Sequence, residues 1–497
     1  MSDIHSALRL FIICAAVCGT LSFIVRAISL KLGVLSRPRG DRWGKSATPT
    51  LGGIAIVATF VICALLWAVG DSQVYWIVAA GLVVFAFGFA DDILHLSVGA
   101  KVTGQIISAC ILIYGGVYVN IYFPFLGIPL SLLWFVGMTN ALNLLDNMDG
   151  LAAGIAAISS CVLVFHCLGG ESARFAPAAA VLSGASVGFL FLNFHPAKLY
   201  MGDCGSQFLG LTLAALAVSA TWREATSLIT LVSVPVLVLC VPIFDTLFVS
   251  LHRRSRGLSV AQGGQDHISH RLVALGVSEQ VAVTFFWVVS GILGIVSIFA
   301  KDYPVLLALA SGAAALALIL FGVLLGKVKV YPGDAAPPQK GVVIKYLVEH
   351  RGAVVLIVLD IIAFFVSYVA AFILRLGDDA FKGVYLLALT QSLPIVLSAK
   401  MLSFLYFRLH QNRLERIDAG ELFSVLKGVS VGTLIAVATT TMAFRFENLP
   451  RKVFIEDWLI SLVLVSAIRL LAGKLSRWQS GPPASSSGRC ETISSNQ

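Results

Sequence analysis

Residues 193–210 read NFHPAKLYMGDCGSQFLG, a polar loop between two apolar stretches that are each long enough to cross a membrane. The loop places Asp203 at a helix end that faces water. Gly202 and Gly205 remove side-chain bulk around this carboxylate, and Ser206 follows it. This setting suits a metal-bound phosphate group. The alternative is an ordinary interhelical turn in which Asp203 caps the next helix.

The composition predicts an all-α, polytopic integral membrane bundle. Hydrophobic residues make up 58% and charged residues 12% of the 497 residues, whereas charged residues make up about 25% of an ordinary soluble domain. The apolar stretches run for about 17–25 residues and lack the alternation of outer-membrane strands, so helices are expected instead of a barrel. The first stretch, 7–30, is too long for a signal peptide and is expected to be a retained span.

Hydropathy predicts about fifteen transmembrane helices, about eleven before residue 327 and about four after residue 350. Their approximate positions are 7–30, 50–69, 76–90, 102–119, 126–141, 151–168, 176–193, 205–220, 227–250, 279–299, 303–325, 352–374, 384–407, 428–444 and 457–473.

Basic residues in short loops predict the orientation of these spans. Five Lys and Arg residues lie in 31–47 and four in 251–276, whereas the loops 70–75 and 120–129 contain none. By the positive-inside rule, the amino terminus then lies outside and the odd-numbered loops lie in the cytoplasm. The same loops explain the net charge of +9, so no nucleic-acid partner is expected.

Five polar clusters fall on the cytoplasmic side of this topology. Carboxylates, amides and cations at one membrane surface indicate phosphoryl chemistry with a divalent cation, because Mg²⁺ is held by one or two carboxylates plus substrate phosphates, and Lys and Arg offset phosphate charge. The clusters comprise residues 45–53; Asp91, Asp92 and Lys101; Asn140, Asn143, Asp146 and Asp149; Asp203; and Asp245 with the segment 252–271.

These polar clusters could also have purely structural roles. Asp91 and Asp92 could be solvated interfacial charge, although adjacent carboxylates at a lipid boundary repel each other and therefore suit a cation or a proton-accepting role. Asp146 and Asp149, spaced i, i+3, could continue an interhelical hydrogen-bonding stripe. The histidines interpreted as structural are His95, His166, His195 and His410.

The motifs N-x-x-N-x-x-D-x-x-D-G-L from Asn140 and M-G-D-x-G-S from Met201, in order with the other clusters, resemble the polyprenyl-phosphate N-acetylhexosamine-1-phosphate transferase family. The resemblance covers residues 1 to about 326 and implies about ten or eleven helices in a bacterial inner membrane, with a cytoplasmic site. The implied reaction is attack by polyprenyl (undecaprenyl) phosphate on the sugar-linked phosphate of a UDP-sugar. The products would be a polyprenyl diphosphate sugar and UMP, a first step of cell-envelope polysaccharide synthesis.

The resemblance also implies roles for individual residues. Asp91, Asp92 and Asp203 form the expected catalytic set, and Asp203 and Asp92 are the expected ligands of Mg²⁺, with Mn²⁺ as the alternative. The residues expected to bind the substrates are Lys45, Lys101, Asn143, Asp146, Asp149, Asn193, His267, His270 and Arg271.

Two departures from the family pattern concern the sugar. The family commonly has D-G-x-D-G where this chain has Asn147 between Asp146 and Asp149, and H-x-H-H-R-L where Ser269 replaces the middle histidine. These departures leave the identity of the sugar open. The P-x-x-D-T form of residues 242–246 favours an N-acetylglucosamine-like substrate over a muramoyl-pentapeptide one.

A basic, Pro-rich segment at 327–345 marks a boundary after the transferase-like part. The predicted domains are 1–326, a transferase membrane domain; 327–350, a cytoplasmic linker; 351–474, a four-helix membrane domain; and 475–497, a disordered cytoplasmic tail. The four later spans resemble the membrane part of polysaccharide-biosynthesis sugar-nucleotide epimerase/dehydratases. Asp360 could instead be a buried polar contact and Arg375 an interfacial snorkelling side chain.

The rival function is a lipid-linked-sugar transporter or a non-catalytic membrane scaffold. Transporters place ionisable residues near the middle of the bilayer. In this sequence only Asp245 and Asp360 are interpreted as lying inside apolar segments, and the other charges lie at one surface. The enzyme is therefore favoured. Its expected partners are the two substrates, the lipid bilayer, and either a second copy of the chain or other polysaccharide-synthesis enzymes.

Overall fold

The computed structural model describes residues 2–36, 47–67, 71–119, 124–221, 228–259, 264, 266–301, 304–326, 328, 351–381, 383–409, 419–444 and 449–479. These residues form seventeen α-helices, two short 3-10 helices and one pair of two-residue strands. The predicted all-α, polytopic fold class is confirmed. The chain divides into two compact units, residues 1–350 and 351–497.

The first unit is a helical bundle with one small antiparallel strand pair, in which Leu35 lies opposite Pro49. Its elements are α1 (Ser2–Leu32), β1 (Leu35–Ser36), β2 (Thr48–Pro49), α2 (Gly53–Trp67), α3 (Ser72–Leu94), α4 (Val98–Tyr114), α5 (Pro124–Leu145), α6 (Leu151–His166), η1 (Glu171–Phe175), α7 (Ala176–Asn193), α8 (Gly202–Thr221), α9 (Leu228–Val238), α10 (Cys240–Ser255), α11 (Ile268–Ala274), α12 (Glu279–Ala300) and α13 (Pro304–Gly326).

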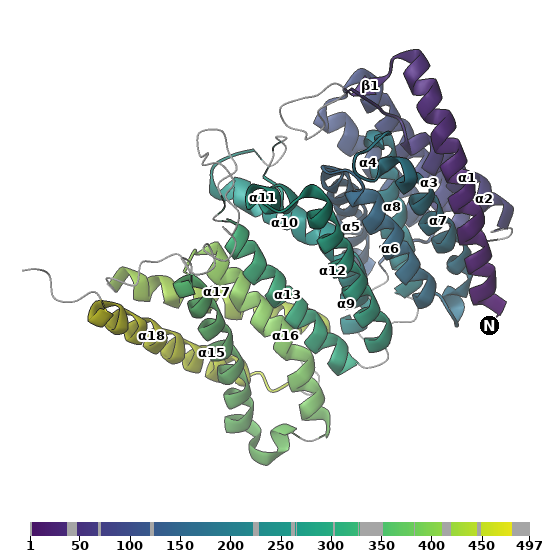
Figure 1. The fold of residues 1–497 in the computed structure, drawn as a ribbon. Coiled ribbons are helices and arrows are strands. Elements are labelled where there is room, and N and C mark those ends of the chain that lie inside the picture. Colours follow the sequence, from purple (N-terminus) through teal and green to yellow (C-terminus); the bar gives the residue numbers. More distant parts are fainter. Residues whose placement is uncertain are drawn as a thin grey trace, which may run out of the picture. The chain divides into compact units, whose positions relative to one another are not determined.

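The central helix of this unit is α8, whose whole apolar stretch is buried among α2, α3, α5, α6 and α9 (Figure 1). Small residues make this packing close. A Cβ atom on Gly205 would lie 2.7 Å from the Cα atom of Gly53 on α2, and one on Gly210 would lie 2.7 Å from the Cα atom of Thr139 on α5. Membrane helices associate through such small-residue faces. The packing of α8 fixes Asp203, in its first turn, at one end of the bundle.

The predicted span 227–250 is wrong as a single helix. The structure contains two helices there, α9 and α10, which meet at Leu239 with a bend of 83°. Pro242 lies in the first turn of α10. Proline has no N–H for a helix interior but fits a first turn, where the N–H would have no intrahelical partner. The chain therefore restarts its helix at this point.

The predicted number of about fifteen spans exceeds the number of helices in the described residues that are long and apolar enough to cross a membrane. Among the described residues nine helices are long and apolar enough to cross a membrane, or ten if α9 and α10 form one span. Four shorter apolar helices lie within α2, α4, α6 and α13. All of the predicted ranges overlap a helix, but α18 (Val453–Gln479) carries the charged residues Asp457 and Arg469 within its predicted span, 457–473.

The second unit contains α15 (Arg351–Leu376), η2 (Gly377–Phe381), α16 (Gly383–Tyr406), α17 (Ala419–Phe444) and α18. In this bundle α15 packs on α16 and α18, and α17 packs on the same two helices. Apolar side chains from the four helices, among them Phe372, Val396 and Phe454, form its core.

Two ion pairs lie inside the second unit. Lys400 Nζ is 2.6 Å from Asp457 Oδ2, and Arg469 Nη2 is 2.6 Å from Asp360 Oδ2, with all four side chains buried. Asp360 is therefore a buried polar contact, as one interpretation of the sequence expected. The expectation that only Asp245 and Asp360 lie inside apolar segments is wrong. Pairing makes the other buried charges tolerable, because an unpaired charge there would be costly.

Candidate active site

The polar clusters meet at the end of the first unit where α8 begins. The segment after β2 reaches this point through its backbone, since the N–H groups of Gly52 and Gly53 donate to the carbonyls of Tyr200 and Met201 at 2.9 and 2.8 Å. This brings the first predicted cluster against the loop that carries Asp203. Lys45, predicted to bind phosphate in that cluster, lies outside the described residues.

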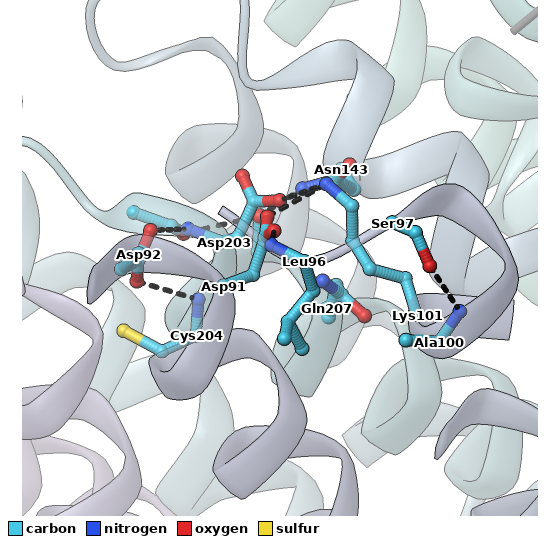
Figure 2. A network of polar contacts seen from close by, with 12 residues as sticks. Asp91, Asp92, Leu96, Ser97, Ala100, Lys101, Asn143, Asp203, Cys204 and Gln207 are labelled. Atoms are coloured by element: carbon cyan, nitrogen blue, oxygen red, sulfur yellow. Dashed lines mark hydrogen bonds and ion pairs between the residues drawn. The ribbon is translucent and has the colours of Figure 1, made fainter. Parts of the chain in front are cut away.

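Lys101 on α4 lies between two carboxylates. Its Nζ atom is 2.6 Å from Asp91 Oδ2 on α3 and 3.0 Å from Asp203 Oδ2 on α8 (Figure 2). Burial lowers the pKa of Lys101, but the carboxylates of Asp203 and Asp91 outweigh this effect and hold the pKa above the ordinary lysine value. Lys101 therefore stays positively charged at neutral pH. Two predicted catalytic residues and one predicted phosphate-binding residue form a single contact group.

Asp91 and Asp92 have different surroundings, because neighbouring residues on a helix point about 100° apart. Asp91 accepts the N–H of Leu96 at 2.7 Å and faces Lys101. Asp92 accepts the backbone N–H groups of Asp203 and Cys204 at 2.8 and 3.0 Å. The acceptor at the start of α8 is thus Asp92, whereas the Asp203 side chain faces Lys101. Asp91, not Asp92, places its carboxylate beside the carboxylate of Asp203.

Two glycine features allow this arrangement. Gly202 has a φ of +79°, a conformation that side chains rarely adopt, and a Cβ atom there would lie 2.6 Å from Asp92 Oδ2. A Cβ atom on Gly88 would lie 2.6 Å from the Cα atom of Cys204. The acidic end of α3 can therefore approach the first turn of α8 only because both positions lack a side chain.

A layer of amides lies beside the carboxylates. Asn143 on α5 donates to Ser206 Oγ at 2.8 Å, and it lies close to the Asp203 carboxylate. Gln105 on α4 bonds to Asn140 at 2.7 Å and to Gln207 at 3.2 Å, and both glutamines are buried. Sequence reasoning missed both. The available signal was an amide inside an apolar helix, where each polar group needs a partner.

The loop between α5 and α6 carries the next two acids. Asp146 follows the last turn of α5 and is half-buried. Asp149 Oδ2 accepts the backbone N–H of Ala197 at 2.9 Å and lies 3.1 Å from His195 Nδ1. Asp149 thus connects its own loop to the loop that leads to Asp203.

Asn193 joins the same two loops instead of presenting a free amide. Its Oδ1 atom accepts the N–H of Gly150 at 3.1 Å, and its Nδ2 atom donates to the carbonyl of Leu199 at 3.0 Å. The side chain is 2% exposed. Both of its polar atoms therefore bind backbone, and the predicted contact of Asn193 with substrate stays a prediction.

The short helix α11 brings the predicted sugar loop to the site. His267 Nδ1 is 2.7 Å from Asp245 Oδ2, and Ser269 Oγ donates to Asn147 Oδ1 at 2.8 Å. The second bond joins the two positions at which the sequence departs from the family pattern. Burial, with a smaller effect of the neighbouring His267, lowers the pKa of His270 to about 4. His270 is therefore neutral at neutral pH.

Arg271 was predicted to bind substrate, which stays a prediction, and the structure shows what holds its side chain. The side chain is fully buried, and it donates to the carbonyls of Asp266, Leu325 and Val328 at 3.0, 3.1 and 2.7 Å. Its guanidinium also lies 5.1 Å from the centre of the Phe248 ring. Arg271 thus fastens α11 to the end of α13.

Comparisons with known proteins identify the family to which this chain is similar. A sequence model of glycosyl transferase family 4 matches residues 73–221, which include Asp91, Asp92, Lys101 and Asp203. The chain is 32% identical to a probable undecaprenyl-phosphate N-acetylglucosaminyl 1-phosphate transferase of Bacillus subtilis, over 58% of this chain and 82% of the relative. It is 32% identical to a decaprenyl-phosphate N-acetylglucosaminephosphotransferase of Mycolicibacterium smegmatis, over 54% and 76%.

A third relative is the phospho-N-acetylmuramoyl-pentapeptide-transferase of Desulfotalea psychrophila, which is 31% identical over 57% of this chain and 90% of the relative. These matches cover most of each relative. The family named from the sequence motifs is confirmed, whereas the resemblance of the second unit to epimerase/dehydratases stays a prediction. The chain therefore belongs to glycosyl transferase family 4, among the polyprenyl-phosphate N-acetylhexosamine-1-phosphate transferases.

Proposed function

We propose that this membrane protein transfers N-acetylhexosamine 1-phosphate from a UDP-sugar to a polyprenyl phosphate and releases UMP. The names of its relatives support a phosphotransferase of this kind. The observation that carries the proposal is the position of Lys101 between the carboxylates of Asp91 and Asp203 at the start of α8. A cation flanked by two acids at a helix start suits chemistry on phosphate groups.

In the proposed step an oxygen of the lipid phosphate attacks the phosphorus atom that is bonded to the sugar. A new P–O bond forms there, and the bond from this phosphorus to the oxygen that bridges to the second phosphate breaks. That oxygen leaves as part of UMP. Lys101 offsets the negative charge that collects on the phosphate oxygens, and Asp91 accepts the proton of a protonated lipid phosphate or holds that phosphate in place.

The donor set fits Mg²⁺ or Mn²⁺. Asp203 with Asp91 or Asp92 would hold the ion, because hard cations prefer carboxylate oxygens. Within the described residues no three His, Cys, Asp or Glu side chains form a metal-binding group. An ion held by two carboxylates would take its remaining ligands from substrate phosphates and water. When bound, the ion would neutralise phosphate charge and polarise the reacting phosphoryl group.

The proposal extends to substrates and location. Undecaprenyl phosphate and UDP-N-acetylglucosamine are the proposed substrates, supported by the form of residues 242–246 and by the name of the Bacillus relative. The distribution of Lys and Arg supports a cytoplasmic site in a bacterial inner membrane. The product would be the first lipid-linked sugar of an O-antigen, an exopolysaccharide or another envelope glycan. The enzyme would act as a homodimer or together with further polysaccharide-synthesis enzymes.

The test is to incubate the purified full-length protein with polyprenyl phosphate, Mg²⁺ and a panel of UDP-sugars, and to measure UMP and lipid-linked sugar. UMP release with at least one UDP-N-acetylhexosamine is expected. The matched control is Asp203→Asn, which keeps the size of the side chain but removes the anionic oxygen and should abolish turnover. Near-normal activity of this variant, or a parent protein that moves lipid-linked sugar across vesicles without making UMP, would overturn the proposal.

A further inference from the structure

His195, which sequence analysis interpreted as structural, lies between two acids from distant parts of the chain. Its Nδ1 atom is 3.1 Å from Asp149 Oδ2 and 3.4 Å from Glu279 Oε2, the latter in the first turn of α12. The three side chains are 31%, 20% and 24% exposed. They are therefore partly enclosed, but a water-soluble ligand can still reach them.

The two contacts determine where the imidazole carries a proton. A neutral imidazole has one nitrogen that donates and one that accepts. Because Nδ1 faces two carboxylate oxygens, which only accept at neutral pH, Nδ1 must be a donor. Glu279 approaches the same nitrogen as Asp149 at the longer distance, so it favours the same tautomer, in which Nδ1 donates.

The contacts also orient Asp149. Both the His195 ring and the Ala197 N–H approach the same oxygen, Oδ2. The carboxylate plane is therefore fixed, and the other oxygen, Oδ1, is turned away from these two donors. An oxygen held in this way is prepared to accept a hydrogen bond from an N–H or O–H group of a ligand without further ordering.

The chain just before His195 is anchored by two residues. Asn193 binds the backbone of the neighbouring loops through both of its polar atoms. The Phe194 ring lies 5.7 Å from the ring of Trp287 on α12, which ties the loop to the helix that carries Glu279. These contacts keep the imidazole of His195 in place. A side chain must be fixed in this way to orient a neighbouring carboxylate, here that of Asp149.

We propose that His195 is a positioning residue: it holds Asp149 so that Oδ1 accepts an N–H or O–H of the uridine nucleotide of the UDP-sugar, and Glu279 favours the tautomer of His195 that does so. This inference rests on the proposed function, because it assigns Asp149 to the nucleotide part of that substrate. It separates the group that holds the nucleotide from the group of Asp91, Lys101 and Asp203 that acts on the phosphates.

The test compares two substitutions of His195 whose amide nitrogens take the places of different nitrogens of the imidazole ring. The amide nitrogen of His195→Asn lies near the place of Nδ1, whereas that of His195→Gln lies near the place of Nε2. KM for the UDP-sugar, kcat, and Kd for UMP are measured on the purified full-length protein. His195→Ala and His195→Gln should raise KM and Kd about tenfold, the loss of one hydrogen bond to a charged group, with kcat changed less than about twofold. His195→Asn should recover most of this loss, and Glu279→Gln should give a smaller rise.

A double-mutant comparison shows whether His195 acts through Asp149. In a protein that already carries Asp149→Asn, His195→Ala should add little to the rise in Kd. The proposal would be overturned if His195→Ala raised the Kd as much in the Asp149→Asn background as in the parent, which would mean that His195 contacts the ligand itself. Equal effects of His195→Asn and His195→Gln on Kd would also overturn it. His5→Ala, on the exposed end of α1, is the control for a histidine substitution away from the site and should leave KM and Kd unchanged. If the parent protein makes no UMP, the proposed function fails, while the Kd for UMP still tests this inference.

Discussion

Asp92 Oδ1 accepts the backbone N–H of Asp203 at 2.8 Å, so the acidic end of α3 holds the first turn of α8. Asp91, one residue earlier, instead faces Asp203 through Lys101. Two adjacent acids thus have separate tasks. One fixes the backbone that carries Asp203, and the other belongs to the charged group at which phosphate chemistry is proposed.

Replacement of Asp91 should reduce turnover far more than UDP-sugar binding. Asp91→Asn removes the charge that faces Lys101 but keeps the size of the side chain. We expect kcat to fall by about 10²-fold or more, the usual effect of losing a proton-transfer group, with a much smaller change in the Kd for the nucleotide. Steady-state UMP release and equilibrium binding measure the two quantities. Equal losses of affinity and turnover would indicate a folding or nucleotide role for Asp91.

Replacement of Asp92 should in addition lower stability. Asp92→Ala leaves the N–H groups of Asp203 and Cys204 without their acceptor at the start of α8. Loss of such a helix cap costs about 0.5–2 kcal/mol. The denaturation midpoint of the detergent-solubilised protein should therefore fall, and turnover should fall with it because Asp203 loses its support. Asp91→Asn is the matched control, and a midpoint for Asp92→Ala that equals that of Asp91→Asn would contradict the capping role.

The pKa of His270 predicts how stability depends on pH. In the folded protein it is lowered from 6.5 to about 4, first by burial and then by His267, while Asp245 and Asp266 act in the opposite direction. The unfolded chain therefore binds more protons between these two values. Stability that is present above pH 6.5 should be lost progressively as the pH falls toward about 4.

The variant His270→Gln isolates this effect, because its side chain does not titrate. Denaturation midpoints are measured at pH 7 and pH 5 for the parent and the variant. We expect the midpoint of the parent to fall more between the two pH values than that of His270→Gln. Parallel falls would mean that other groups carry the pH dependence and that His270 is not buried in its neutral form.

Sequence reasoning identified the fold class and the chemistry of the site, because both depend on local patterns. Long apolar stretches require helices in lipid, and the residues that surround Asp203 lie in short motifs at the ends of those stretches. The union of Asp91, Lys101 and Asp203 in one group agrees with their assignment to one site, although their exact roles stay predictions.

Other features depend on partners that lie far apart in the chain. Lys400 pairs with Asp457 across 57 residues, and Arg469 with Asp360 across 109. No periodicity reveals such pairs, so Lys400, Asp457 and Arg469 were missed, whereas Asp360 was identified without its partner. Arg271 shows the same limit: its position in a motif suggested a ligand contact, and the sequence did not reveal that two of its three acceptors are backbone carbonyls more than fifty residues away.

The last prediction concerns the two units. All clusters suited to phosphoryl transfer lie before residue 273, so a chain that ends within residues 329–338 is expected to keep transferase activity. Arg271 refines this expectation, because it binds the carbonyls of Leu325 and Val328. A chain that ends after Pro338 keeps both acceptors, whereas one that ends after Leu324 loses both and leaves a buried guanidinium poorly paired, which is strongly destabilising.

The two truncations form a matched pair. We expect the chain ending after Pro338 to release UMP at a rate close to that of the full-length protein, and the chain ending after Leu324 to lose both activity and thermal stability as α11 detaches from α13. Size-exclusion chromatography in detergent and denaturation midpoints report whether each chain is folded, and UMP release reports the activity. Membrane helices can also support one another through small-residue faces. A chain ending after Pro338 that is folded but inactive would therefore show that the second unit contributes to the site, and would place the functional boundary beyond residue 338.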